Sequence, residues 1–160
     1  MRQLIKTIII PSGMFMINIV KSQVSKRYIA KLLKEKREIF LDVGAGAKRG
    51  ENGWTTIDMN WSCDIFWDLR KGIPFPDSSI SKIYSSHFLE HLTFKEGKRF
   101  LDECLRVLTT GAVFSICVPN ARIYIDAYMA NSDLDRNLFL GYTPAYNSTT
   151  KIDFINYIAS

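Results

Sequence analysis

The amino-acid sequence predicts an α/β protein built on a doubly wound, mostly parallel β-sheet. Short runs that are apolar on both faces recur along the chain, and loops or helical segments separate them. Strands of this kind are typical of parallel sheets that helices cover on both faces. The first such run, "EIFLDVG", ends in a glycine, as strands do where the chain turns at the edge of a sheet.

Five strands and two helices are expected. The strands are predicted at 38–44, 54–60, 63–69, 81–87 and 111–120, and the helices at 24–38 and 94–108. Apolar residues at helical spacing define the two buried helix faces. For the first helix they are Val24, Tyr28, Ile29, Leu32 and Leu33, and for the second Phe94, Phe100, Leu101, Leu105 and Leu108.

A chain of 160 residues is long enough for one domain with a single core. We divide it into three parts. Residues 1–38 hold an apolar segment and a basic amphipathic helix, residues 39–120 hold the core, and residues 121–160 form an incomplete C-terminal part. A short helix is expected at 123–129, and the final apolar piece "FINYIA" stops without a terminating signal.

Charge is concentrated near the N-terminus. The net charge is +5, and residues 21–38 contain seven Lys or Arg against two Glu. A single basic helix beside an apolar segment fits contact with an anionic membrane surface better than nucleic-acid binding. We therefore predict no nucleic-acid partner and expect peripheral membrane contact through residues 1–37, with a merely solvated helix face as an equal alternative.

No transmembrane segment is predicted. The apolar stretch 7–20 has fourteen residues and contains Pro11 and Gly13, so it is too short and too interrupted to span a bilayer. Three scattered cysteines, Cys63, Cys104 and Cys117, form no pair of metal-binding or redox spacing. They indicate buried, reduced thiols and a cytoplasmic protein that is cytosolic or attached to the membrane surface.

Two carboxylates and two glycines mark the predicted binding site. Asp42, Gly44 and Gly46 surround the turn after the first strand, and Asp58 lies at the end of the second. Ligands of doubly wound sheets bind at the carboxyl ends of the strands, where glycine lets the backbone approach closely. A carboxylate there can accept hydrogen bonds from both ribose hydroxyls, so the pattern predicts a nucleoside cofactor. A plain strand-ending role for Asp58 is the alternative.

The spacing disfavours a dinucleotide. Arg49 stands where the dinucleotide motif G-x-G-x-x-G has its third glycine, and Asp58 follows Gly46 by only 12 residues. No crossover helix fits in that interval, so a loop or single turn is expected there. Asp42 would repel a diphosphate but attract a sulfonium or an amino group. We therefore favour S-adenosylmethionine over NAD, and rank a nicotinamide-linked oxidoreductase third among the functions.

Four ordered blocks carry a family resemblance: "LDVGAGA", "TTIDMN", "DIFWDLRKGIPFPDSSISKIYSSHFLEHL" and "FLDECLRVLTTGAVFSICVPN". Over residues 39–120 the chain resembles class I S-adenosylmethionine-dependent methyltransferases. More narrowly, it is similar to short methyltransferases of polysaccharide and lipopolysaccharide biosynthesis. The resemblance implies a Rossmann-like core whose terminal hairpin is missing here, so we expect C-terminal truncation, with dimerisation or a partner covering the open edge.

The resemblance also implies roles for individual residues. Asp42, Gly44 and Gly46 would line the methionine part of the cofactor, Asp58 would hold the ribose, and Met59 would pack on the adenine. Asp68 and Leu69 would contact the adenine, although Asp68 could equally be a turn residue. Ser86 and His87 would face the sulfonium and the acceptor.

His87 and His91 are the only histidines and lie four residues apart. One of them is the best candidate for a general base, because imidazole titrates near neutrality; a structural role for His91 is equally expected. No third ligand accompanies them, so no metal is predicted. Two functions from different classes stand: methyl transfer to a small-molecule or saccharide acceptor, and a catalytically inactive module that binds a partner or membrane.

Overall fold

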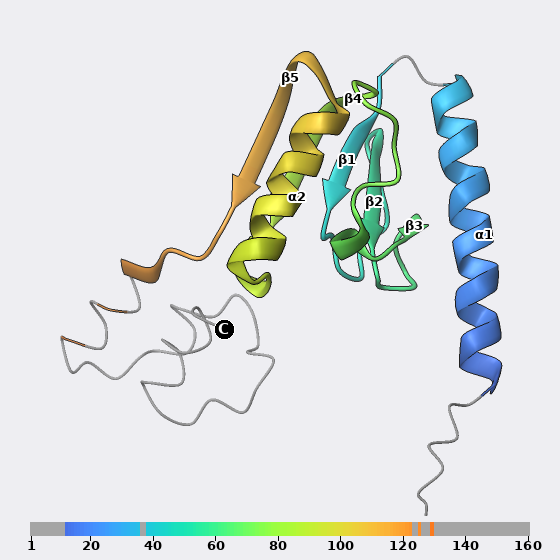
Figure 1. The fold of residues 1–160 in the computed structure, drawn as a ribbon, viewed down its shortest axis with the longest axis horizontal. Helices are drawn as coiled ribbons and strands as arrows, with labels where there is room; N and C mark the ends of the chain where they lie inside the picture. The colour runs from blue at the N-terminus through green and yellow to red at the C-terminus, as the bar shows by residue number, and fades with distance from the viewer. Residues whose placement is uncertain (1–11, 36–37, 123–124, 126–128, 130–160) are drawn as a thin grey trace, which may run out of the picture.

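The computed structural model describes residues 12–35, 38–122, 125 and 129, and Figure 1 shows their arrangement. The elements are α1 (Ser12–Glu35), β1 (Phe40–Val43), β2 (Trp54–Asp58), β3 (Ile65–Phe66), the 3₁₀ turn η1 (Leu69–Lys71), β4 (Ile80–Ser86), the 3₁₀ turn η2 (Leu89–His91), α2 (Phe94–Val107) and β5 (Leu108–Cys117). Most of the helix expected at 123–129 lies outside the described residues. The apolar stretch before residue 12 lies wholly outside them.

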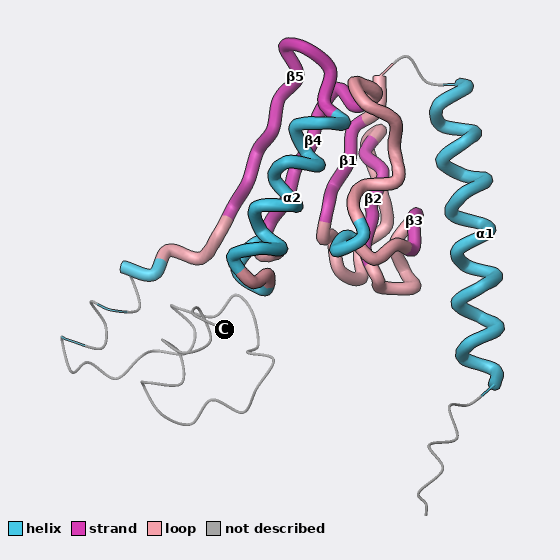
Figure 2. Tube along the Cα trace, in the orientation of Figure 1, coloured by secondary structure: helices cyan, strands magenta, loops and turns pink. Residues whose placement is uncertain are grey.

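The five strands form one parallel sheet in the order β3-β2-β1-β4-β5. This order reverses direction at β1, as the doubly wound prediction requires, so the α/β fold class is confirmed. Between Gly46 and Trp54 the chain makes only turns and loop, also as predicted. Figure 2 shows this connection as loop, and it runs from the carboxyl end of β1 to the amino end of β2 because the two strands are parallel.

β3 and β5 differ most from the predicted strands. β3 contains only Ile65 and Phe66, although the Trp67 N–H still donates to the Asp58 carbonyl of β2 at 2.9 Å. β5 begins at Leu108, directly after α2, rather than at Gly111. Gly111 instead lies within the strand with a positive φ of 79°, at a shift in the register with β4. A left-handed residue there lets the extra residues bulge out of the ladder.

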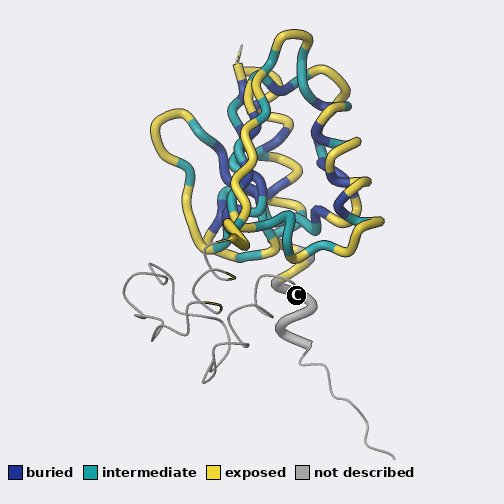
Figure 3. The backbone as a smooth tube through the Cα atoms, turned by 90° about the vertical axis from the view of Figure 1, so that its left-hand side faces the viewer, coloured by how far each residue is buried: buried dark blue, intermediate teal, exposed yellow. Residues whose placement is uncertain are grey.

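One sheet face carries the hydrophobic core. Its strand residues are fully buried and pack with the inner sides of α1 and α2 and the segment from Leu69 to Phe75. The strand residues of this core are Leu41, Val43, Ile57, Ile65, Ile80 and Ile83. Figure 3 shows the buried positions gathered in the interior and the exposed positions along the edge.

The sheet face opposite this core carries a row of half-buried aromatic rings across three strands. The Phe40 and Trp54 centroids are 5.5 Å apart, and those of Trp54 and Tyr84 are 6.3 Å apart. The Lys82 ammonium lies 4.7 Å from the Phe40 centroid. These rings shield one another. Helical cover of both faces stays a prediction, because residues 1–11 and 130–160 lie outside the described residues.

α1 starts twelve residues earlier than predicted and runs along the β3 edge of the sheet (Figure 1). Ile29 and Leu32 join the core as expected, and Tyr28 packs against it. Val24 is exposed instead of buried. Ser25 is buried in its place, because its hydroxyl accepts the Phe66 N–H at 2.9 Å and so ties the helix to the edge strand.

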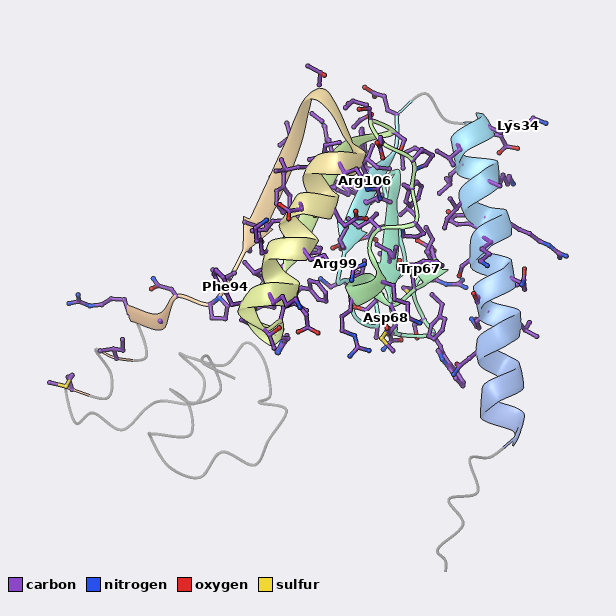
Figure 4. The ribbon with its side chains drawn as sticks, in the orientation of Figure 1. Lys34, Trp67, Asp68, Phe94, Arg99 and Arg106 are labelled. Atoms are coloured by element: carbon purple, nitrogen blue, oxygen red, sulfur yellow. The ribbon has the colours of Figure 1, made fainter. Side chains whose placement is uncertain are left out.

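α2 buries a different face from the one predicted. Phe100 is buried as expected, but Phe94 is 92% exposed and Leu105 69% exposed. Figure 4 shows Phe94 at the end of the helix, pointing away from the sheet. The buried stripe is Gly97, Phe100, Cys104 and Val107. The small residues Gly97 and Cys104 let the helix approach the sheet closely, and the larger leucines remain outside.

The cysteines are only partly as predicted. Cys63 and Cys104 are buried, whereas Cys117 at the end of β5 is exposed. Burial raises the pKa of the Cys104 thiol to about 12 and also raises that of Cys63. Both buried thiols are therefore protonated at neutral pH. Across the described residues no helix has the length and apolar character needed to cross a bilayer.

A network around Arg106 attaches α2 to the loop before β4. Its guanidinium donates to the carbonyl oxygens of Ile73 and Phe75 at 2.9 Å, and to the carboxylates of Glu103 and Asp77 at 2.7 Å. The second Glu103 oxygen accepts from Arg106 Nε at 2.8 Å. These hydrogen bonds hold the pKa of the Glu103 carboxyl below its usual value.

Arg106→Met is expected to lower the free energy of unfolding by about 2 kcal/mol, because two carbonyls and two carboxylates lose a charged donor. Glu103 contributes stability above its unfolded pKa of about 4.3, and this contribution is lost as pH falls through its lower folded pKa. The variant lacks this contribution, so its stability should fall less than that of the wild type below about pH 4. Urea titrations at several pH values measure the free energy of unfolding. Lys95→Met, at an exposed position on the same helix, is the control.

Candidate functional site

The glycine bend after β1 forms as predicted. Gly44 has a φ of 74° and Gly46 a φ of 64°, a region that L side chains rarely occupy. The Gly44 N–H donates to the Ile57 carbonyl at 3.0 Å, so the bend is joined to β2. A Cβ at Gly44 would lie 2.4 Å from the Phe88 ring, and this close contact sets the bend directly against the segment after β4.

Asp58 organises the carboxyl end of β2. One oxygen of its carboxylate accepts the Gly46 N–H at 3.0 Å, and the other accepts the Asn60 N–H at 2.9 Å. A carboxylate has about four acceptor positions, so each oxygen retains capacity for a further donor. The Gly46 N–H thus joins Asp58 directly to the glycine bend, and ribose binding by Asp58 stays a prediction.

A cavity of about 210 Å³ opens beside Asp58. It unites four residues that the sequence singled out as cofactor-binding or catalytic besides Asp58 itself. These are Met59, Asp68, Leu69 and His91, and the rest of the lining is Trp67, Arg70, Phe88 and Leu92. The lining combines apolar and aromatic side chains with the charged groups of Asp58, Asp68 and Arg70. This mixture suits a nucleoside, which has a flat base and a sugar with hydroxyl donors.

The cavity adjoins a larger one of about 510 Å³ against α1. Met59, Trp67 and Asp68 line both, and polar residues of α1, among them Lys26, complete the second. Figure 4 shows Trp67 and Asp68 on the side of the sheet toward α1. The indole N–H of Trp67 donates to the Gly72 carbonyl at 2.8 Å, which fixes the ring between the two cavities.

Asp68 is a turn residue, as the alternative expected, and its contact with adenine stays a prediction. Its side chain accepts the Arg70 N–H at 3.1 Å and caps η1, and it pairs with the Arg70 guanidinium at 2.9 Å. The Arg70 hydrogen bonds lower the pKa of the Asp68 carboxyl. Sequence reasoning missed Arg70, although a basic residue two positions after a turn aspartate is a signal that could have indicated it.

Asp42 is separated from the nucleoside-sized cavity. It lies on the aromatic face, in a cavity of about 350 Å³ that Lys48, Glu51, Trp54 and Tyr84 also line. Burial raises the pKa of its carboxyl, the Lys48 charge opposes this, and the Asp58 charge adds to it. The two predicted carboxylates thus interact electrostatically but do not share a cavity lining.

Asp64 holds the loop between β1 and β2, and sequence reasoning missed it. Its Oδ2 accepts the N–H groups of Gly50 at 2.9 Å and Thr56 at 3.0 Å, and the Thr56 hydroxyl at 3.0 Å. A helix usually connects such strands, and here a loop takes its place. The three hydrogen bonds to the Asp64 carboxylate hold this loop against β2.

Ser86 and His87 lie at the end of β4, as predicted. His87 has a left-handed φ of 53°, and its Nδ1 lies 3.3 Å from the Glu90 carboxylate. Neither Ser86 nor His87 lines the nucleoside-sized cavity, whereas His91 does. Among the described residues no three His, Cys, Asp or Glu side chains gather as a metal-binding group.

One part of the chain is similar in sequence to known proteins. Residues 63–116, about a third of the chain, match the family model described as a methyltransferase domain. A segment of 57 residues is 37% identical to a Mycolicibacterium smegmatis protein named as an S-adenosylmethionine-dependent methyltransferase; it takes in 33% of this chain and 21% of that protein. The chain thus matches about a fifth of that relative.

Two solved structures are similar in fold. One is an S-adenosyl-L-methionine-dependent methyltransferase from Methanococcus maripaludis, at 15% identity and a TM-score of 0.42, covering 79% of this chain and 72% of that one. The other comes from a complex between the Haloferax volcanii Trm112 methyltransferase activator and a methyltransferase, at 14% identity and a TM-score of 0.42, covering 89% of each chain. The matched family and the curated relative are both named for methyl transfer, the relative with S-adenosylmethionine as its cofactor.

Proposed function

We propose that the protein binds S-adenosylmethionine and transfers its methyl group to a hydroxyl of a small molecule or saccharide. The observation that best supports the proposal is the position of Asp58. Its carboxylate is oriented by the Gly46 and Asn60 N–H groups and lines the nucleoside-sized cavity. The matched family and the name of the Mycolicibacterium relative support the choice of cofactor.

The residues present fit this cofactor. Asp58 would accept hydrogen bonds from the ribose hydroxyls, and Met59 and Leu69 would pack on the adenine, with Asp68 at its edge. The glycine bend, joined to Asp58, would lie toward the methionine end, whereas Asp42 lines a separate cavity on the aromatic face and has no part in this proposal. When bound, the cofactor would supply an activated methyl group on a sulfonium. The protein's task is then mainly to orient the acceptor and exclude water.

The hydroxyl acceptor rests on the two histidines. A hydroxyl must lose its proton during methylation, and His87 or His91 could accept it. The saccharide class and the link to polysaccharide biosynthesis rest on the family resemblance of residues 39–120.

The alternative function is an inactive module that binds a membrane or partner. The exposed surface of α1 supports it, because Lys26, Arg27 and Lys31 lie on the same helix as the exposed apolar residues Val20 and Val24. Such a surface suits an anionic membrane. A peripheral enzyme in the cytoplasm would use the same surface, so nucleoside binding is the property that separates the two functions.

Isothermal titration calorimetry with S-adenosylmethionine, S-adenosylhomocysteine and NAD tests the proposal. We expect one site with micromolar affinity for S-adenosylhomocysteine, an affinity of about −8 kcal/mol, and no measurable heat with NAD. Absence of binding by all three ligands would reject the enzyme and leave the inactive module. Binding of NAD alone would instead indicate the oxidoreductase.

A further inference from the structure

We propose that Glu90 is a positioning residue that fixes the tautomer of His87 for its role as the general base. The inference rests on the proposed methyl transfer and selects between the two histidines. Glu90 Oε1 lies 3.3 Å from His87 Nδ1, and the two residues are three positions apart across η2. His91, by contrast, lines the nucleoside-sized cavity with Asp58 and Asp68.

The burial of Glu90 is unusual for a carboxylate. Its side chain is 11% exposed, while that of His87 is 47% exposed. Its Oε2 is one of two buried side-chain polar atoms without a hydrogen-bond partner among the described residues, together with the Ser85 hydroxyl. A carboxylate with one unsatisfied oxygen is costly to bury, so stability alone does not account for this placement.

The backbone at His87 is also held in a costly conformation. Its φ of 53° lies in the left-handed region, which non-glycine residues rarely adopt. The His87 N–H donates to the Cys117 carbonyl at 3.0 Å, and the His91 N–H donates to the Phe88 carbonyl at 3.1 Å. These bonds fix both ends of the turn that brings Glu90 under the imidazole. Strain of this kind concentrates at functional sites.

The carboxylate determines which ring nitrogen carries the proton. A proton on Nδ1 faces Glu90, and the lone pair is then on Nε2, the nitrogen that can act as the base. During transfer the acceptor hydroxyl gives its proton to Nε2 while its oxygen bonds to the methyl carbon. The electron pair of the broken carbon–sulfur bond stays on sulfur. The Glu90 charge would stabilise the imidazolium that forms.

Nitrogen-15 NMR of the histidine rings tests the assignment without any acceptor. The chain has two histidines, so the ring spectra contain two sets of signals, and His91→Gln assigns them. At a pH where both imidazoles are neutral, we expect the Nδ1–H tautomer at His87. In Glu90→Met, which removes the acceptor oxygens, the His87 pattern should shift to the Nε2–H tautomer while the His91 signals remain in place. Glu90→Gln keeps an amide oxygen that can accept from Nδ1, so its shift should be smaller.

Asp102→Asn is the matched control, because it also removes one negative charge but lies on the exposed side of α2. It should leave both histidine patterns unchanged. An Nε2–H tautomer at His87 in the wild type, or an unchanged pattern in both Glu90 variants, would overturn the inference. Calorimetry with S-adenosylhomocysteine on the same samples separates this failure from a failure of the proposed function, because Glu90→Gln should retain wild-type affinity.

Discussion

Gly44→Ala is expected to lower the free energy of unfolding by about 3 kcal/mol, since overpacking and a left-handed alanine each cost about 1–2 kcal/mol. The new Cβ would lie 2.4–2.6 Å from three atoms of Phe88, at a φ of 74°. Phe88 must then move, and it lines the nucleoside-sized cavity. Affinity for S-adenosylhomocysteine should therefore fall together with stability.

Gly46→Ala is the matched control for this effect. Its φ of 64° is similar, but a Cβ there has no neighbour within 4 Å. Only the backbone cost of about 1 kcal/mol should remain. Urea denaturation of both variants, with calorimetry on the folded proteins, measures the difference. Equal destabilisation by the two substitutions would contradict the close contact of Gly44 with Phe88.

Asp58→Ala is expected to reduce affinity for S-adenosylhomocysteine about 100-fold, which corresponds to two charged hydrogen bonds of about 1.5 kcal/mol each. The same substitution removes the acceptor of the Gly46 and Asn60 N–H groups. The free energy of unfolding should therefore also fall, by about 2 kcal/mol. Calorimetry below the unfolding transition measures the affinity separately from the stability.

Asp64→Ala distinguishes cofactor binding from loop anchoring. Asp64 holds the same crossover loop through Gly50 and Thr56, but it does not line the nucleoside-sized cavity. This variant should lose comparable stability while its affinity for S-adenosylhomocysteine stays within about threefold of wild type, a change below 1 kcal/mol. If both aspartate variants lost affinity equally, Asp58 would act only through the loop.

The sequence predicts the sheet well, and it predicts that several candidate residues gather at one edge of the sheet, because both follow from local patterns. Apolar runs ending in Gly44 or Asp58 identify parallel strands and their carboxyl ends, and those ends meet at one edge of the sheet. Met59 and Leu69 follow two neighbouring strand ends and line the same cavity. Asp42 shows the limit of this reasoning, because alternation along β1 turns its side chain to the opposite face.

The missed features depend on contacts between distant residues. The apolar stripe of α2 suggested burial of Phe94 and Leu105, yet close packing at Gly97 and Cys104 decides which face meets the sheet. Such small residues give no hydrophobic signal. The Asp64 bonds to Gly50 span 14 residues, and no spacing rule predicts them. The position of Glu90 beneath His87 likewise depends on a 3₁₀ turn with a left-handed residue.

Mapping the bound nucleoside by backbone amide NMR tests the central claim most directly. On titration with S-adenosylhomocysteine, we expect the largest chemical-shift changes at residues 44–46, 58–60, 67–70 and 86–92. Amides around Lys48 and Trp54 should change little. Saturable shifts confined to the aromatic face, or a spectrum unchanged at millimolar ligand, would contradict a nucleoside site at Asp58.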